Sequence, residues 1–549
     1  MKLNLLMVAV ALGAAPAIVN AAAYSVQELP VTSLSANQFG SSIDNSGLIL
    51  TTLTNPFNPP IDMSLFDVAN FPSLSDPDAA AQGNFNTSDY TLVVNAFRNN
   101  AVSFSTFGQK LASRVIYQTD GTDAQYVFGF DQEQDNTNGF TFALNSNVAG
   151  SANGAYIAGN STSLFRPVDF VTDAGDEFTA VIADFFQRGF VQFDGNTTPL
   201  LPIDTTLEGR SQANAINENL QVAGASSVGV RDAITTGIET CNSEENTFPL
   251  DICLYELKTR VQEQFIRRAT VWQLDAQGEV ISSEFYPLSF TPEADDTRNF
   301  VNDALDINNA GVAVGSGTVL RNNVGVSAAM VYENGTTTRL IEDDDMLPNF
   351  AIGINDAGIV AGYQIQAINN QGRAKLFTYD LNSGELVFPD DFFVSSSTIP
   401  RDINNNGIVV GDGEIEASQS QRRRAAFMYD MQSGEFVNLN DLIACDSPYD
   451  IVSANSINDS NEIVADATVF RSQKNVRGEA LLDADGNEIF ETAVVALKLT
   501  PTGQEAPDCS VPDAENPDLE RQGASTNTLI IIALLGLAVF RRKRFSKNR

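Results

Sequence analysis

Histidine is absent from the 549-residue sequence. Ser-His-Asp and Cys-His catalytic sites, histidine-ligated zinc and imidazole pH switches all depend on that side chain, so the sequence excludes them. No other motif has the spacing of a catalytic or cofactor-binding site, and we assign no residue to either role.

Basic residues are scarce as well, since 32 lysines and arginines stand against 69 aspartates and glutamates, for a formal net charge of −37. A body with this charge repels nucleic acid and anionic lipid, which excludes nucleic acid as a partner. It suits a salty medium and attracts divalent cations. We therefore expect no cofactor, with calcium as the alternative.

Cysteine is limited to four residues: Cys241, Cys253, Cys445 and Cys509. Their spacing fits no zinc site, and their even number agrees with an oxidising compartment. Three pairings are open in principle. We expect a local bridge between Cys241 and Cys253 and a second between Cys445 and Cys509.

Addressing signals occupy both ends of the chain. One lysine precedes an apolar run at the N-terminus and small residues follow it, so residues 1–21 indicate a secretory signal peptide. A retained membrane helix is the alternative. The acidic, proline-rich residues 501–526 predict an extended linker.

The C-terminal tail, residues 527–549, has an apolar stretch from Leu529 to Phe540 followed by basic residues. It is shorter than the ~20 residues of a permanent membrane span. Together with Gly523, Ala524 and Ser525 before it, the tail resembles the GlyGly-CTERM and PEP-CTERM sorting signals of Gram-negative bacteria. The resemblance implies transient contact with the inner membrane and cleavage near these small residues. A plain membrane anchor is the alternative.

One phrase recurs through the body: an apolar residue, then Asn, Asp and Gly, then an apolar run. It occurs at 42–50, 143–150, 215–224, 307–315, 354–362, 403–411 and 456–466. Asn and Asp satisfy local backbone groups and Gly accepts a positive φ, so the phrase predicts a tight β-hairpin. We expect the small Ala-Gly pair that ends the phrase, as in Ala361-Gly362, to lie where neighbouring units pack closely against each other.

A second hairpin follows each phrase, as in 373–388 and 424–439. Two hairpins make a four-stranded unit, which at about 45–50 residues is typical of a β-propeller blade. We predict an all-β propeller over residues 22–500 with seven blades, the last closed by the N-terminal strand. Six or eight blades, an open solenoid and separate sandwiches are the alternatives.

The first three units carry insertions, at roughly 51–142, 151–190 and 225–267. Functional loops concentrate in such segments. Within the third, residues 254–269 have apolar side chains at four-residue spacing, which predicts a helix packed on the rim.

These features together resemble an uncharacterised family of exported Gram-negative proteins, the domain of unknown function 3466 with HAF-type repeats. The similarity rests on the Ile-Asn-x-x-Gly-x-Val-x-Gly phrase, the Arg-Ala-x-x-x-Tyr-Asp strand after it, and the two ends. The motif is structural, so it implies a fold and transfers no catalytic residue.

Carboxylate pairs are frequent, but 69 acidic residues make chance pairs common, and we assign none to catalysis. The pairs are Asp295-Asp296, Asp390-Asp391 and those within 342–345. Residues 483–488 and 120–123 resemble fragments of calcium loops, yet both fit hairpin turns. No metal ligand is identified.

Two further predictions concern single features. The segment Arg422 to Arg424 precedes a strand and is expected to be a solvated loop. The lone tryptophan, Trp272, lies in a predicted third strand and is expected in the core.

The sequence favours a non-enzymatic, exported propeller at the cell envelope that binds or scaffolds an envelope protein, a glycan or matrix material. Two other classes stay open. One is a histidine-free polysaccharide hydrolase or lyase that uses loop carboxylates, and the other is a purely structural surface-layer component.

Overall fold

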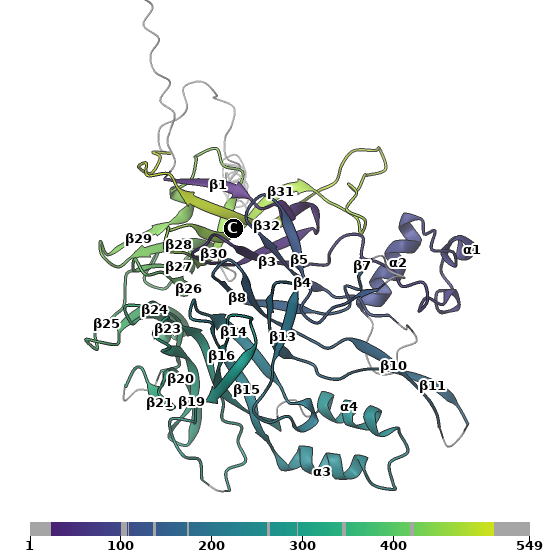
Figure 1. Ribbon diagram of the computed structural model, residues 1–549. Coiled ribbons are helices and arrows are strands. Elements are labelled where there is room, and N and C mark those ends of the chain that lie inside the picture. The colour runs from purple at the N-terminus through teal and green to yellow at the C-terminus, as the bar shows by residue number, and fades with distance from the viewer. Residues whose placement is uncertain are drawn as a thin grey trace, which may run out of the picture. The chain divides into compact units, whose positions relative to one another are not determined.

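The computed structural model describes residues 23–99, 107, 109–134, 139–172, 175–260, 264–293, 295–342, 347–417 and 422–509. These residues contain seven four-stranded antiparallel sheets, the blades of a β-propeller (Figure 1). The predicted fold class and blade number are therefore confirmed. In each blade the first strand lies innermost, at the central channel.

The first three blades are longer in sequence than the others. Blade 1 consists of β2 (Asn37–Ile43), β3 (Ile49–Thr54), β4 (Arg114–Thr119) and β5 (Ala124–Val127). Blade 2 consists of β8 (Ser146–Ala152), β9 (Tyr156–Ser161), β12 (Arg188–Phe193) and β13 (Asn196–Leu200). Blade 3 consists of β14 (Ser211–Ile216), β15 (Gln221–Val230), β16 (Phe265–Leu274) and β17 (Val280–Phe285).

Blades 4 to 6 follow without large insertions. Blade 4 consists of β18 (Asn302–Ile307), β19 (Ala313–Arg321), β20 (Val324–Glu333) and β21 (Thr336–Arg339). Blade 5 consists of β22 (Asn349–Ile354), β23 (Ile359–Ile368), β24 (Gln371–Asp380) and β25 (Leu386–Val387). Blade 6 consists of β26 (Thr398–Ile403), β27 (Ile408–Glu414), β28 (Arg424–Asp430) and β29 (Glu435–Asn438).

Blade 7 joins the two ends of the propeller. It consists of β30 (Asp450–Ile457), β31 (Ile463–Ser472), β32 (Phe490–Pro501) and the N-terminal strand β1 (Tyr24–Glu28). Strand β1 pairs antiparallel with β32, with Val26 opposite Leu499. The pairing covers an open sheet edge, and the predicted closure is confirmed.

The recurring phrase forms the turn between the first and second strands. In blade 6 the Asn404 carboxamide oxygen accepts hydrogen bonds from the amides of Asn406 (3.1 Å) and Ile408 (3.0 Å). Gly407 has a φ of +77°, a conformation that costs glycine little. The two side-chain bonds repeat in blades 4, 5 and 7, with Asn461 in place of the glycine in blade 7, so the phrase is a hairpin turn, as predicted.

The glycine that closes the phrase is required within its own blade. In blades 3 to 6 a β-bulge in the innermost strand brings a carbonyl against the glycine on the second strand. A Cβ atom on Gly411 would lie 2.2 Å from the Ile399 carbonyl oxygen, and one on Gly362 would lie 2.3 Å from that of Phe350. The expectation that neighbouring units crowd the Ala-Gly pair is therefore wrong for the glycine, because its obstacle is the adjacent strand of the same sheet. It holds for Ala361, which packs in an apolar cluster with Ile403 and Val409 of blade 6.

The phrase predicted at 143–150 is misplaced. Residues Ser146–Ala152 form the innermost strand β8, and the turn of blade 2 follows at Asn153 and Gly154. This turn is shorter than the others, so its sequence does not match the longer phrase.

The three insertions each connect the second and third strands of a blade. Residues 55–113 contain the 3₁₀ turn η2 (Val68–Asn70) and the helices α1 (Pro77–Ala80) and α2 (Thr87–Arg98). Residues 162–187 contain the hairpin β10 (Phe165–Val171) and β11 (Glu177–Ala183). Residues 231–264 contain α3 (Asp232–Cys241) and α4 (Leu250–Arg260).

The helix predicted at 254–269 is only partly correct. Helix α4 ends at Arg260, and Phe265 begins strand β16. Apolar residues of a buried strand therefore continued the helical spacing by chance.

The remaining short elements are connectors. They are the hairpin β6 (Glu133–Gln134) and β7 (Gly139–Phe140) and the 3₁₀ turns η1 (Pro30–Ser33), η3 (Thr206–Glu208) and η5 (Leu439–Asp441).

The core is divided between adjacent blades. Trp272 of β16 is fully buried, and its indole nitrogen donates to the Leu201 carbonyl oxygen at 3.0 Å, so its predicted core position is confirmed.

No helix in the described part of the chain is long and apolar enough to cross a membrane. The predicted signal peptide, residues 1–21, and the tail, residues 527–549, lie outside that part, as do Gly523, Ala524, Ser525 and most of the predicted linker.

Candidate functional site

A ring of turn residues links the blades around the central channel. The first turn asparagine of one blade donates its Nδ2 to the carbonyl oxygen of the equivalent residue in the next. These bonds join Asn217 to Asn308 (2.8 Å), Asn308 to Asn355 (3.1 Å), Asn355 to Asn404 (3.1 Å), Asn404 to Asn458 (2.9 Å) and Asn458 to Asp44 (3.2 Å).

Blade 2 completes this circuit in another way, because its turn is shorter. Its Gly154 amide donates to Asp44 Oδ2 at 2.8 Å, and Asn153 Nδ2 donates to the Glu218 carbonyl oxygen at 3.0 Å. All seven blade junctions are thus hydrogen-bonded at this end of the channel.

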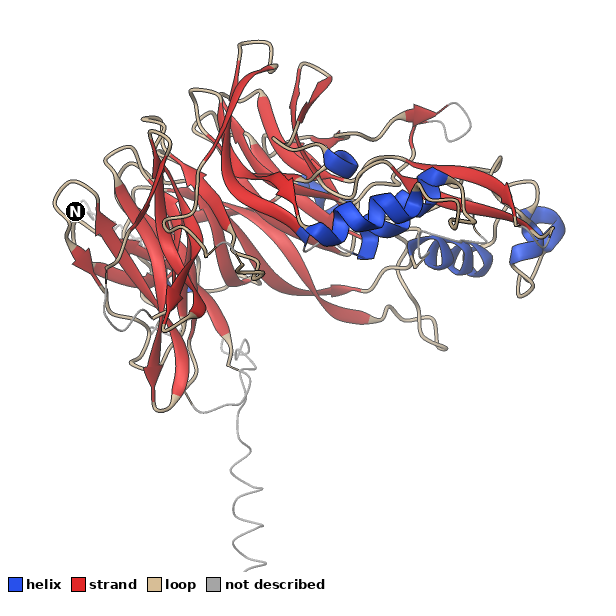
Figure 2. Cartoon of the chain, turned by 90° about the horizontal axis from the view of Figure 1, so that it is seen from below, coloured by secondary structure: helices blue, strands red, loops and turns tan. Residues whose placement is uncertain are grey.

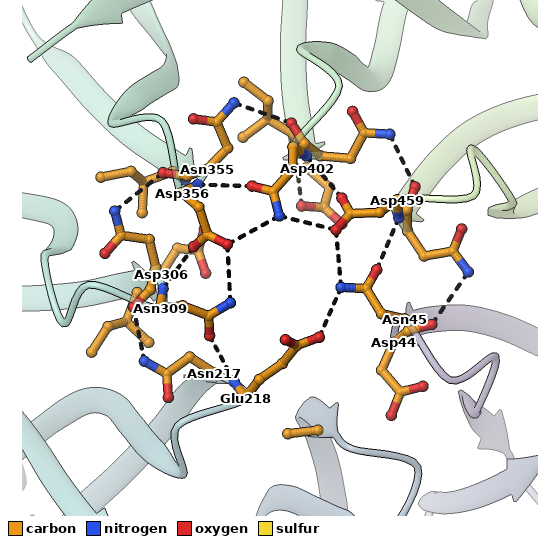
Figure 3. A pocket seen from close by; sticks show the side chains of 18 of the residues that line it. Asp44, Asn45, Asn217, Glu218, Asp306, Asn309, Asn355, Asp356, Asp402 and Asp459 are labelled. Atoms are coloured by element: carbon orange, nitrogen blue, oxygen red, sulfur yellow. Dashed lines mark hydrogen bonds between the residues drawn. The ribbon is translucent and has the colours of Figure 1, made fainter.

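The second turn residues form an inner ring around the opening, which we call the mouth ring (Figure 3). It alternates amides with carboxylates: Asn45, Glu218, Asn309, Asp356, Asn405 and Asp459. Each asparagine lies between two acidic residues, so amide donors separate the negative charges.

Hydrogen bonds run between neighbours of the mouth ring. Asn405 Nδ2 lies 3.1 Å from Asp356 Oδ2 and 2.9 Å from Asp459 Oδ2. Asn45 Nδ2 lies 3.1 Å from Asp459 Oδ2 and 2.8 Å from Glu218 Oε1. Asn309 Nδ2 lies 3.0 Å from Asp356 Oδ2. The ring therefore surrounds the opening with three ordered carboxylates.

Two further carboxylates, Asp306 and Asp402, line the same cavity, whose volume is about 170 Å³. Asp306 Oδ2 accepts from the Ile354 amide at 2.7 Å, and Asp402 Oδ2 accepts from the Ile457 amide at 2.9 Å. Burial raises the pKa of Asp306. Burial, together with the charge of Asp306, raises the pKa of Asp402 to about 7.

The insertions form a second candidate site, a surface that we call the insertion platform and define as the described residues within 55–113, 162–187, 231–264 and 473–489. Figure 2 shows the insertion helices gathered on one side of the strands. Because the segments all join second strands to third strands, they leave the blades at the same ends of the sheets.

The second and third insertions pack on each other. Phe170 and Ile182 of the hairpin share an apolar cluster with Ile252 and Tyr255 of α4. Lys258 donates its Nζ to the Asp184 carbonyl oxygen at 2.6 Å. The Cys241–Cys253 disulfide ties α3 to α4, as the local pairing predicts.

The first insertion packs against the loop of blade 7. Val476 joins the apolar cluster around α2. The Arg477 guanidinium lies 4.1 Å from the centroid of the Tyr90 ring, and its Nη2 donates to the Phe85 carbonyl oxygen at 2.8 Å. The platform is therefore packed structure with defined side-chain contacts.

Exposed aromatic rings mark one part of the platform. Phe178 of β11 is 47% exposed and Phe248, before α4, is 45% exposed. Both rings pack on the buried Phe170, at centroid distances of 5.7 and 5.9 Å. We call Phe170, Phe178 and Phe248 the aromatic tip.

The residues singled out in the sequence do not come together in one site. Cys445 and Cys509 are disulfide-bonded, so none of the four cysteines is free. Asp296 pairs with Arg298 and Asp391 with Lys375, while 343–346 lie outside the described residues. Residues 120–123 and 483–488 form turns in which Asp120 and Asp483 accept backbone amides.

The prediction of a solvated loop at Arg422 to Arg424 is wrong for two of the three arginines. Arg422 pairs with Glu414 at 2.7 Å, and Arg424 pairs with Asp412. Glu414 and Asp412 both lie on strand β27, beside the two arginines. Their separation from the arginines along the sequence did not predict this pairing.

The mouth ring was not predicted, although its signal is present in the repeats. Its members follow the first asparagine of each aligned phrase, and Asn and Asp alternate there from 309 to 459. The aromatic tip has no such signal, because its rings come from separate insertions.

Comparisons with known proteins agree with the family resemblance. Over residues 1–543 the sequence matches the model of a family described as protein of unknown function (DUF3466). No curated protein matches it.

Two solved structures illustrate the similarity in fold. Pyrococcus horikoshii acylaminoacyl peptidase has 13% identity and a TM-score of 0.38, over 80% of this chain and 51% of the peptidase. The chain thus spans about half the length of that enzyme. The Dos1 propeller has 8% identity and a TM-score of 0.35, over 87% of this chain and 96% of its own. At these scores neither match bears on function.

Proposed function

The chain belongs to this family of unknown function, and we propose that it is a non-enzymatic binding or scaffolding module exported to the cell envelope. The insertion platform is its binding surface. Its partner is an envelope protein, a glycan or matrix material.

The observation that carries this proposal is the aromatic tip. A protein with a net charge of −37 is kept soluble by charge, yet two phenylalanines on a packed, disulfide-tied surface are nearly half exposed. Exposed aromatic side chains of this kind are enriched where proteins bind partners.

The acidic residues of the first insertion support binding over hydrolysis. Asp67 and Asp76 accept helix N-terminal amides, from Ala69 at 2.9 Å and Ala79 at 3.0 Å. Asp89 accepts the amides of Ser75 (2.8 Å) and Asp76 (3.1 Å), and these bonds lower its pKa. Capping explains the positions of Asp67 and Asp76.

Disulfides indicate an oxidising compartment, in agreement with export. The signal peptide and the sorted or anchored tail remain part of the proposal. The competing function is a histidine-free hydrolase or lyase. Among the described residues, Asp131 is the best candidate for the catalytic acid of such an enzyme, because burial raises the pKa of Asp131.

The test uses the purified full chain on a glycan array and against envelope extracts fractionated into defined proteins. We expect saturable binding to one class, reduced at least tenfold by the Phe178→Ala/Phe248→Ala double substitution. Phe285→Ala/Phe388→Ala removes two comparably exposed rings outside the platform and is the control. Equal loss in both double variants, or none in the first, would overturn the proposal.

A further inference from the structure

We propose that the channel behind the mouth ring is a divalent-cation site that takes calcium, held by the carboxylates of Asp306 and Asp402 and by neutral oxygens around them. This inference is independent of the platform, so its failure would leave the binding proposal intact.

The carboxylates occupy equivalent positions in two blades. The residue before the phrase isoleucine is Asp306 in blade 4 and Asp402 in blade 6, and both line the cavity; in blade 5, between them, it is Gly353. A Cβ atom on Gly353 would lie 3.2 Å from Ile403 Cγ2 and 3.6 Å from Asp306 Oδ2, so the glycine leaves room for the Asp306 carboxylate beside Ile403.

A second observation comes from the opposite wall. Ser151 of blade 2 lines the same cavity, is only 8% exposed, and its hydroxyl oxygen has no hydrogen-bond partner. A buried hydroxyl without a partner costs free energy, and a cation or its water shell would satisfy this one.

The charges lack a counterion within the cavity. All charged side chains that line it are acidic: Asp44, Glu218, Asp306, Asp356, Asp402 and Asp459. The groups that donate to Asp306 and Asp402 are neutral, so the two carboxylates repel each other when both are ionised. A divalent cation removes that repulsion, and the mouth ring raises the local cation concentration.

The donor chemistry selects the kind of metal. Every donor in the cavity is oxygen or amide nitrogen, and the chain has no histidine, so hard cations are favoured over zinc or copper. Calcium accepts neutral oxygens and variable geometry, whereas magnesium demands a regular octahedron. The described residues contain no group of three acidic or sulfur ligands, so the proposed site has two carboxylate ligands and otherwise neutral oxygens.

Isothermal titration of the EGTA-treated full chain with calcium chloride tests this assignment. We expect one saturable site with an affinity on the order of 10⁻⁴ M, as in extracellular modules. Asp306→Asn/Asp402→Asn should weaken binding at least tenfold, and Ser151→Ala should weaken it less. Glu385→Gln, an exposed acid in blade 5, is the matched control and should bind as the wild type does.

Two results would overturn the site: no saturable binding by the wild type, or equal binding by the double variant. If the double variant does not fold, crystals of the wild type grown with terbium decide the matter. An anomalous peak between Asp306 and Asp402 supports the site, and its absence rejects it.

Discussion

Asparagine is suited to the first turn position because its side chain both accepts and donates. Asn404 accepts two amides of its own turn and donates to the Asn458 carbonyl oxygen of the next blade. Aspartate can perform the first role alone, as Asp44 does, and there the next blade supplies the donor through Gly154. The amide therefore combines turn formation with blade assembly.

Asn404→Asp should separate these roles. The turn keeps its acceptor, but a carboxylate oxygen then faces the Asn458 carbonyl oxygen. We expect a loss of ~1–3 kcal/mol in the free energy of unfolding, measured by urea denaturation at pH 7. An unchanged midpoint would show that the inter-blade bond contributes nothing.

Asp466 makes stability depend on pH. Burial, with a smaller contribution from the charge of Asp412, raises the pKa of Asp466 to about 6, against the opposing effects of hydrogen bonds from Asn455 and Gly40 and of the Arg401 charge. Between the unfolded value of about 4 and the folded value, the native state binds more protons, so stability falls as pH rises. In the wild type the Gly40 amide donates to Asp466 Oδ1 at 2.8 Å, and the Asp466→Asn substitution keeps an acceptor for this amide.

The stability of Asp466→Asn relative to the wild type should therefore increase from pH 4 to pH 7. Thermal melts of both proteins across this range give the difference. A constant difference would contradict the assigned pKa shift.

The blade is the element that the sequence predicts best. Asn, Gly and β-branched residues specify each hairpin locally, so blades 4 to 7 follow from the repeat alone. Blade 2 was misplaced because Asn153 and Gly154 make a shorter turn. The three insertions were predicted, but their packing into one platform was not, because contacts such as Arg477 with Phe85 join segments 392 residues apart.

Gly411→Ala tests the bulge in blade 6. The added Cβ would overlap the Ile399 carbonyl oxygen, which is backbone and cannot move aside, so we expect a loss of ~3 kcal/mol. Gly229→Ala is the control, since its Cβ would meet only the end of Ile266, at 3.7 Å. Chemical denaturation should show little change in the control, and equal losses would contradict the account.

For the whole molecule, closure depends on β1. Its pairing joins residues about 470 positions apart and covers the outer edge of blade 7. Long-range closure of this kind cannot be predicted from the repeat of a single blade. The sequence nevertheless has a strand without a partner at each end, and these two strands predicted the closure.

A chain that begins at Leu29 should lose this closure. We expect a lower melting temperature and concentration-dependent association in size-exclusion chromatography, because the edge of β32 is exposed. A monomer as stable as the full chain would show that the remaining blade junctions suffice.

The most direct test of the proposed function measures binding and turnover on the same ligand, with alanine substituted at each acidic residue of 51–142. A binding module predicts saturable binding by every folded variant and turnover by none, the wild type included. Turnover by the wild type that is lost on substitution of two particular carboxylates would contradict it and identify an enzyme.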